Sequence, residues 1–301
     1  MMNISMKHIR YFEALARHAH FGRAAEDCAI SQPALSLQMK ELEEMLGAPL
    51  VERGARQIRL TSLGESFASR ARAILRAVDE LGDLARATHS PLLGRLRIGV
   101  IPTVAPYLLP TIIQDLTRHC PGLDLWPREA VTKKLLADLA EGRLDTAIVA
   151  LPVSEPSLHE EPLLEEEFVL VRPLDHAGRP VPTPEALWRM RLLLLEEGHC
   201  FRDQALSFCS MTPAVPRDLM EGSSLSTLVQ MVGAGIGVTL IPQMAIAMET
   251  RSAAVSVARL HHPRPGRAIG MVWRRSNPLA DHFAHVAAII RRGGDTQVAA
   301  Q

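Results

Sequence analysis

The feature that most limits how this chain can fold is one long helical stretch that ends in a sharp break. From Thr61 to about Thr88 the sequence contains no proline, and its apolar residues are spaced alternately four and three apart. These residues are Phe67, Ala71, Ile74, Val78, Leu81 and Ala85. A period of 3.5 residues favours a helix that pairs with a second helix, although a solitary helix can also lay such a seam on its own domain. Because Ser90-Pro91 breaks the helix, we expect a domain boundary there.

A small helical domain is predicted before this helix. Apolar residues at helical spacing indicate a first helix capped by Ser5, a short second helix over 21–28 and a third helix that begins after Ser31. Two short strands are predicted at about 50–52 and 58–60. This order of elements is typical of a winged helix-turn-helix.

The outward face of the third helix predicts DNA binding. Its side chains are small or polar, so the helix backbone can enter a major groove while Gln and Ser bond base edges. Arginines in the following hairpin can neutralise phosphates. The predicted DNA-binding residues are Ser31, Gln32, Pro33, Ser36, Gln38, Lys40, Arg53 and Arg56. The alternative is a small helical domain with a solvated polar face. Since helix-turn-helix proteins usually read two half-sites as dimers, we expect the long helix to pair.

The composition places limits on the function. The formal net charge of the 301 residues is +0, so any DNA contact must come from a local basic patch. Neither a signal peptide nor a run of about 20 apolar residues is present, which predicts a cytoplasmic protein with no membrane contact. The chain lacks the glycine-rich motifs of nucleotide sites, and its four cysteines lack metal-site spacing, so no cofactor is expected.

A different pattern, in which strands and helices alternate, begins near Leu96. Strands are predicted at about 96–101, 123–129, 145–150, 168–172, 192–195, 237–241 and 268–274, and helices at about 106–119, 132–141, after 199, 223–234 and 278–291. Such alternation predicts mostly parallel sheets flanked by helices, arranged as two small α/β lobes with a ligand site between them. The segment from Gly293 onward is predicted to be a disordered tail.

One cysteine in this region has the surroundings of a reactive thiol. Cys200 lies between His199 and Arg202 at the predicted start of a helix, and Cys209 follows nine residues later. A cation and a helix N-terminus both favour the thiolate, which is the reactive form. Two thiols that only fill an apolar core are the alternative interpretation.

At this point the whole chain resembles the LysR-type transcriptional regulators. The residues that carry the resemblance are Phe21-Gly22-Arg23-Ala24-Ala25-Glu26, Ser31-Gln32-Pro33-Ala34-Leu35-Ser36, Leu42-Glu43, Leu46-Gly47, Leu50-Val51-Glu52-Arg53 and Leu60-Thr61. With the breaks predicted above, the resemblance implies an α/β protein with a winged helix-turn-helix at 1–61, a dimerising linker helix at 62–90, a two-lobed effector domain like a periplasmic binding protein at 91–292 and a disordered tail at 293–301. Homodimers or homotetramers on promoter DNA, acting with RNA polymerase, are implied as well.

The effector half resembles the peroxide-sensing branch of that family. The matching segments are Ile101-Pro102-Thr103-Val104, Pro106-Tyr107-Leu108-Leu109-Pro110, Glu129-Ala130-Val131-Thr132, 197–205 with Phe208-Cys209, and Gly266-Arg267-Ala268-Ile269-Gly270. The resemblance implies that Cys200 is the peroxidatic thiol and Cys209 the resolving thiol of an activator of oxidative-stress genes, reset by a cellular thiol reductant. It also implies that Thr103, Thr132 and His199 bind hydrogen peroxide and that Arg267 supports the pocket. Ser210-Met211-Thr212-Pro213 departs from the usual acidic and small residues, which affects the expected rate of the switch or its partner contacts.

The spacing of the two cysteines has a mechanical consequence. Nine residues of helix would separate their Cα atoms by roughly 13 Å, whereas a disulfide needs Cα atoms within about 7 Å. A bond between them would therefore require the helix to unwind. Two other functions remain open at this stage: a regulator that binds a small metabolite between the lobes through Thr103 and Thr132, and a thiol peroxidase, which would leave the first 90 residues without a role.

Overall fold

The computed structural model describes residues 4–53, 58–89, 94–209 and 220–299. The chain divides into two compact units, Met1–Ala85 and Arg86–Gln301. Each unit has its own buried apolar core. We describe them separately below.

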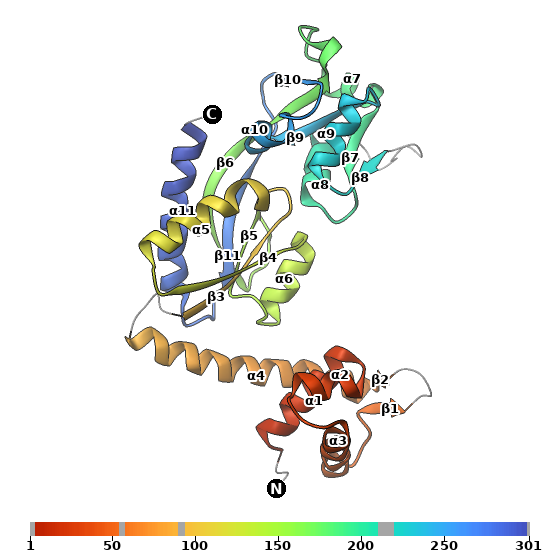
Figure 1. Ribbon diagram of the computed structural model, residues 1–301, viewed down its shortest axis with the longest axis vertical. Coiled ribbons are helices and arrows are strands. Elements are labelled where there is room, and N and C mark those ends of the chain that lie inside the picture. Colours follow the sequence, from red (N-terminus) through yellow and green to blue (C-terminus); the bar gives the residue numbers. More distant parts are fainter. Residues whose placement is uncertain (1–3, 54–57, 90–93, 210–219, 300–301) are drawn as a thin grey trace. The chain divides into compact units, whose positions relative to one another are not determined.

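The N-terminal unit is a winged helix-turn-helix followed by a long helix (Figure 1). Its elements are α1 (Met6–His18), α2 (Phe21–Asp27), α3 (Gln32–Leu46), β1 (Val51–Arg53), β2 (Ile58–Leu60) and α4 (Ser62–His89). The predicted caps are present: the Ser5 hydroxyl accepts from the His8 amide and the Ser31 hydroxyl from the Ala34 amide, each at 3.3 Å. β1 and β2 form the antiparallel wing.

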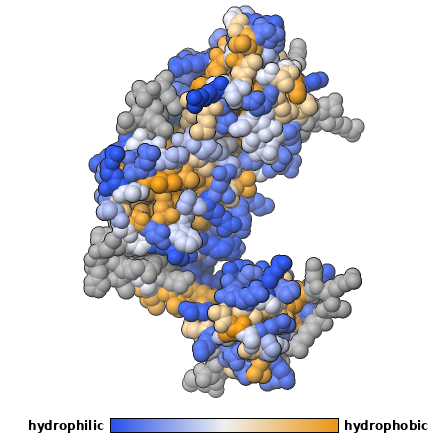
Figure 2. All heavy atoms as spheres, viewed as in Figure 1, coloured by the Kyte–Doolittle hydropathy of each residue, from blue (hydrophilic) through white to orange (hydrophobic). Residues whose placement is uncertain are grey.

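The apolar side chains of α4 are buried near the start of the helix and exposed further along it. Near its start, Phe67 packs edge-on against Phe12 at 5.2 Å between ring centroids, and Ala71 is buried. Further along, the apolar seam is open to solvent: Ile74 is 44% exposed and Leu81 65% exposed. Figure 2 shows apolar side chains along this helix. The start of α4 thus completes the core of the N-terminal unit, while the rest presents an uncovered apolar stripe.

The C-terminal unit contains a sheet of nine strands with helices on its faces (Figure 1). Its strands are β3 (Gly94–Val100), β4 (Leu123–Glu129), β5 (Thr146–Leu151), β6 (Leu158–Pro173), β7 (Leu192–Leu195), β8 (Glu221–Gly222), β9 (Val238–Pro242), β10 (Val255–Arg259) and β11 (Gly266–Arg274). Its helices are α5 (Ala105–His119), α6 (Thr132–Ala140), α7 (Pro184–Arg189), α8 (Cys200–Phe208), α9 (Leu225–Gly233), α10 (Ile246–Glu249) and α11 (Ala280–Ala299), with short 3-10 turns η1 (Leu174–His176) and η2 (Gln243–Ala245).

The strand order corrects the prediction of mostly parallel sheets. The order is β4-β3-β5-β11-β6-β9-β7-β8, with β10 paired to β6. β3 runs parallel to β4 and β5, and β7 runs parallel to β8 and β9, so each lobe has a parallel centre. The 16-residue β6 and the adjacent β11 run antiparallel to their neighbours and join the two lobes. The alternation of strands and helices shows the parallel centres, but it contains no signal for long strands that cross between lobes.

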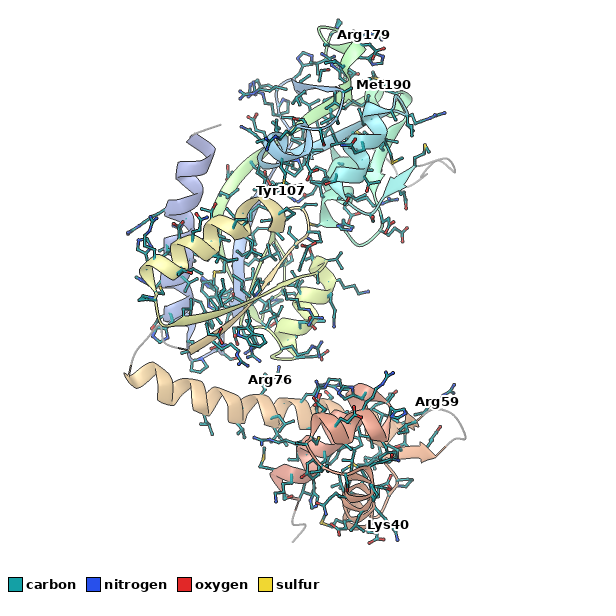
Figure 3. All side chains as sticks on the ribbon, viewed as in Figure 1. Lys40, Arg59, Arg76, Tyr107, Arg179 and Met190 are labelled. Atoms are coloured by element: carbon teal, nitrogen blue, oxygen red, sulfur yellow. The ribbon has the colours of Figure 1, made fainter. Side chains whose placement is uncertain are left out.

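Two separate apolar clusters define the lobes. The first surrounds β3, α5 and β5, and the second surrounds β7, α8, α9 and β9. Tyr107, labelled in Figure 3, belongs to α5 but packs with the second cluster, and its hydroxyl donates to Glu249 at 2.6 Å. The lobes are therefore in direct contact beside the strands that join them.

The prediction of a disordered tail from Gly293 is wrong as far as Ala299, because α11 continues to that residue. Glycines usually weaken a helix interior. Here, however, α11 lies beside α5 (Figure 1), and a Cβ at Gly293 would come within 2.1 Å of the Asp115 carboxylate. Packing of α11 against α5 therefore accompanies a helix in a segment whose glycines disfavour one.

Candidate functional site

Three separate segments of the C-terminal unit converge on the Cys200 thiol. The loop after β3 supplies Thr103, the start of α6 supplies Thr132, and the start of α8 supplies His199 and Cys200. With Ile101, Pro102 and Val131 they line a small pocket. The structure thus brings together four of the residues that the sequence predicted for one site.

Local backbone geometry places the thiol at the pocket. Gly198 has φ +97, a conformation that L side chains rarely adopt, and it turns the chain from β7 toward α8. His199 is extended at the N-cap, and Cys200 is the first residue of the helix. Thr132 has the equivalent position in α6, after the extended Val131. Both helices therefore direct backbone N–H groups toward this region, which favours negative charge.

Two polar atoms of the pocket lining are buried without a partner in the described part of the chain. They are Thr132 Oγ1 and His199 Nδ1. Buried polar atoms are normally paired, so such atoms can accept or donate hydrogen bonds to a small polar molecule. Burial lowers the pKa of His199, while Glu196 and Glu129 act in the opposite direction. His199 is thus a neutral imidazole at neutral pH.

A buried ion pair supports the Thr103 side of the pocket. Arg267 Nη1 donates to Thr103 Oγ1 at 2.8 Å, and Nη2 donates to the Thr103 carbonyl at 3.0 Å. Arg267 Nε donates to Glu166 at 2.8 Å. Burial raises the pKa of the Glu166 carboxyl, and the charge and hydrogen bond of Arg267 oppose that shift. Arg267 therefore lies behind the pocket and contacts Thr103, one of the residues that line it.

The two cysteines of the motif lie in different surroundings. All four cysteines of the chain are thiols. Cys200 is partly buried against the first apolar cluster, whereas Cys209, at the C-cap of α8, is buried in the second. Their Cα atoms are separated by the length of α8, about 13 Å for an intact helix. A disulfide between them therefore requires α8 to unwind.

Arg202 has a different role from the one that the sequence predicted. Its buried guanidinium donates to the Leu195 carbonyl at 2.8 Å and to Glu221 at 2.6 Å. These contacts attach α8 to β7 and β8 of its own lobe. Its charge is therefore already matched by a carboxylate of its own lobe.

Comparisons with known proteins identify the family. A model described as "LysR substrate binding domain" matches residues 89–295, and one described as "Bacterial regulatory helix-turn-helix protein, lysR family" matches residues 6–65. The chain belongs to the LysR family. It is 44% identical over 291 residues to a Streptomyces viridosporus protein named "Probable hydrogen peroxide-inducible genes activator", which covers 95% of this chain and 93% of the relative.

Solved structures of LysR proteins agree with the fold. Full-length OxyR from Pseudomonas aeruginosa, with a cysteine-to-aspartate substitution, matches with a TM-score of 0.77 and 36% identity, over 96% of this chain and 95% of that one. A cysteine-to-serine mutant of Corynebacterium glutamicum OxyR with bound hydrogen peroxide matches with a TM-score of 0.68 and 36% identity, over 99% and 94% of the two chains. The two-lobed architecture is therefore that of LysR regulators.

In the LysR helix-turn-helix the predicted DNA-binding residues lie mainly on α3. Ser31, Gln32, Pro33 and Lys40 are exposed there. Gln38 is partly buried and donates to Glu41 at 2.6 Å, and Ser36 is partly buried. Lys40 and Arg59, labelled in Figure 3, extend from α3 and β2. Arg56 and the side chain of Arg53 lie outside the described residues.

One polar residue behind the pocket, Glu166, was not predicted from the sequence. It lies in a run of acidic residues on β6, where it cannot be told from its solvated neighbours. Across the described ranges, no group of three His, Cys, Asp or Glu side chains is placed to hold a metal ion. In those same ranges no helix is long and apolar enough to cross a membrane.

Proposed function

We propose that this LysR protein is a DNA-binding transcriptional regulator that senses hydrogen peroxide through Cys200. The observation that carries the proposal is the small pocket at the start of α8, which Cys200 lines together with Thr132 and His199, whose buried Oγ1 and Nδ1 have no partner among the described residues. A relative named as a probable activator of hydrogen peroxide-inducible genes and a related structure with bound peroxide support the same conclusion.

The first chemical step is oxidation of the Cys200 thiolate. Its sulfur attacks one oxygen of hydrogen peroxide, the O–O bond breaks, and the other oxygen leaves as hydroxide that takes a proton to become water. The product is a sulfenic acid. Thr103 and Thr132 orient the uncharged peroxide through their hydroxyls, and neutral His199 contributes a ring nitrogen. No charged clamp is needed for such a ligand.

The second step is condensation of the sulfenic acid with Cys209. The Cys209 sulfur displaces the sulfenic oxygen, which leaves as water, and a Cys200–Cys209 disulfide forms. Because an intact α8 holds the two Cα atoms about 13 Å apart, the helix must unwind, and both thiols must leave their apolar clusters. This remodelling changes how the effector unit presents itself to its partners and so regulates transcription. A cellular thiol reductant returns the disulfide to two thiols.

The lining of the pocket favours peroxide over a metabolite. Its described residues offer two hydroxyls, an imidazole and a thiol beside apolar side chains, and none is an arginine or lysine that would hold a metabolite's carboxylate. A steady-state thiol peroxidase is not favoured either, because the helix-turn-helix unit would have no part in such a reaction. We therefore propose a regulator and not an enzyme.

The partners follow from the N-terminal unit. We propose that residues 1–61 bind promoter DNA in the cytoplasm through the α3 residues together with Arg53 and Arg56. Residues 62–90 form the linker helix, and 91–292 form the sensing domain. The exposed seam of α4, with Leu81 65% exposed, supports a homodimer that assembles further into a homotetramer. The DNA-bound assembly acts with RNA polymerase as an activator of oxidative-stress genes.

The decisive experiment combines disulfide mapping with a promoter footprint. After a stoichiometric peroxide pulse, mass mapping is expected to find a Cys200–Cys209 bridge, and the footprint is expected to change. Cys200→Ser retains DNA binding but loses the peroxide-dependent change. A footprint that still responds to peroxide in Cys200→Ser would disprove peroxide sensing by this thiol. A metabolite that stabilises the fully reduced protein in a thermal-shift screen would favour the metabolite-binding alternative.

A further inference from the structure

The Glu166–Arg267 ion pair contacts both the pocket beside Cys200 and the helix α8. The side chain of Arg267 is 0% exposed and that of Glu166 4% exposed. Glu166 accepts from the Met244 amide at 3.3 Å through its other oxygen. The Arg267 guanidinium also lies 5.3 Å from the ring centroid of Phe201, the residue after Cys200. A charge pair this deeply buried is costly unless its geometry is well satisfied, and here most of its hydrogen bonds are made.

The hydrogen bonds define the orientation of the Thr103 hydroxyl. Glu166 holds one edge of the guanidinium at Nε, which directs Nη1 toward Thr103 Oγ1 at 2.8 Å. A hydroxyl has one hydrogen and two lone pairs, and an arginine can only donate. Thr103 Oγ1 therefore accepts from Arg267, and its own hydrogen points elsewhere. Thr103 lines the pocket, so that hydrogen is available to a ligand next to Cys200.

We propose that Glu166 is a positioning residue for the peroxide reaction: acting through Arg267, it makes Thr103 a hydrogen-bond donor to the departing oxygen of peroxide. This inference rests on the proposed function. When the Cys200 sulfur attacks one peroxide oxygen, negative charge develops on the other as the O–O bond breaks. A donor already aimed at that oxygen stabilises the transition state. The oxygen leaves as hydroxide and is protonated by solvent.

The test measures two reactions of Cys200 in the full-length protein carrying Glu166→Gln. Because the variant loses the charge that fixes Arg267, oxidation by hydrogen peroxide is expected to slow about tenfold. Alkylation of Cys200 by iodoacetamide, which has no departing oxygen, is expected to change less than about twofold. A purely structural role would change both rates. Glu167→Gln is the matched control, because Glu167 is on the same strand and pairs with Arg264 at 3.0 Å, away from the pocket.

A double-mutant cycle tests whether the effect passes through Thr103. Thr103→Val is expected to slow oxidation, and adding Glu166→Gln to it is expected to slow oxidation no further. Additive effects of the two substitutions, or a wild-type oxidation rate in Glu166→Gln, would overturn the inference. If Glu166→Gln does not fold, Glu166→Asp keeps the charge but shortens its reach, and the same cycle is measured on that variant. Slow reaction of wild-type Cys200 with peroxide would instead refute the proposed function itself.

Discussion

The need to unwind α8 predicts that its helical stability controls how fast the disulfide forms. Ser207 offers a clean test because its side chain is exposed, so substitution alters helix propensity with little effect on packing. Glycine is about 1 kcal/mol less favourable than alanine in a helix interior. If the Cys200 sulfenic acid reacts with Cys209 only from the unwound helix, its rate scales with the unwound population. A difference of about 1 kcal/mol corresponds to a roughly fivefold difference in rate.

The expected order is Ser207→Gly faster than wild type and Ser207→Ala slower, with at most about fivefold between the two variants, because Ser207 lies in the last turn of α8 and not in its interior. The assay is a peroxide pulse followed by rapid quenching with an alkylating reagent and mass mapping of the Cys200–Cys209 bridge. Loss of the Cys200 thiol, which reports the first step, is expected to be equal in both variants. Gln114→Gly and Gln114→Ala provide the matched control, because Gln114 is exposed in α5. Equal rates of disulfide formation in the Ser207 pair would refute the argument that unwinding limits the reaction.

Three further predictions concern the pocket, its pH dependence and the linker helix. Thr132→Val removes a hydroxyl from the pocket and is expected to slow Cys200 oxidation about tenfold without changing DNA affinity in a titration; an unchanged oxidation rate would contradict its role. Since burial lowers the pKa of His199, the unfolded chain takes up a proton more readily than the folded one. The contribution of neutral His199 to stability is therefore present above about pH 6.5 and lost as the pH falls below that value. Between pH 7.5 and 5.5 the melting temperature of His199→Gln is expected to fall less than that of wild type. Leu81 is 65% exposed, so Leu81→Glu is expected to change monomer stability by less than about 0.5 kcal/mol while weakening dimers, measured by sedimentation velocity; undisturbed dimers would argue against pairing through α4.

Much of the fold was predictable because its signals are local. The caps at Ser5 and Ser31 and the apolar spacing of Leu35, Met39 and Leu42 predicted α1 and α3 closely. β4 and β7 begin and end where the sequence placed them. In contrast, β10 was missed, since its short, partly exposed strand has no strong alternating pattern.

The chemistry of the candidate site was only partly predictable. The helix start at Cys200 follows from the local sequence, and a resemblance to LysR regulators pointed to Thr103, Thr132, His199 and Arg267. The charge partner of Arg202 was not predictable. Glu221 follows it by 19 residues and becomes a neighbour only because β8 pairs with β7.

The sequence by itself determined most of the longer helices and the nine-residue spacing that prevents a disulfide on an intact α8. These properties depend on backbone periodicity and capping, which act over a few residues. The tertiary structure alone decided which side chains meet. Arg267 is 164 residues from Thr103 and 101 residues from Glu166, and they come together because antiparallel β6 and β11 pass beside the loop after β3. Burial and hydrogen-bond partners set the behaviour of such groups, and both are properties of neighbours that are distant in the chain.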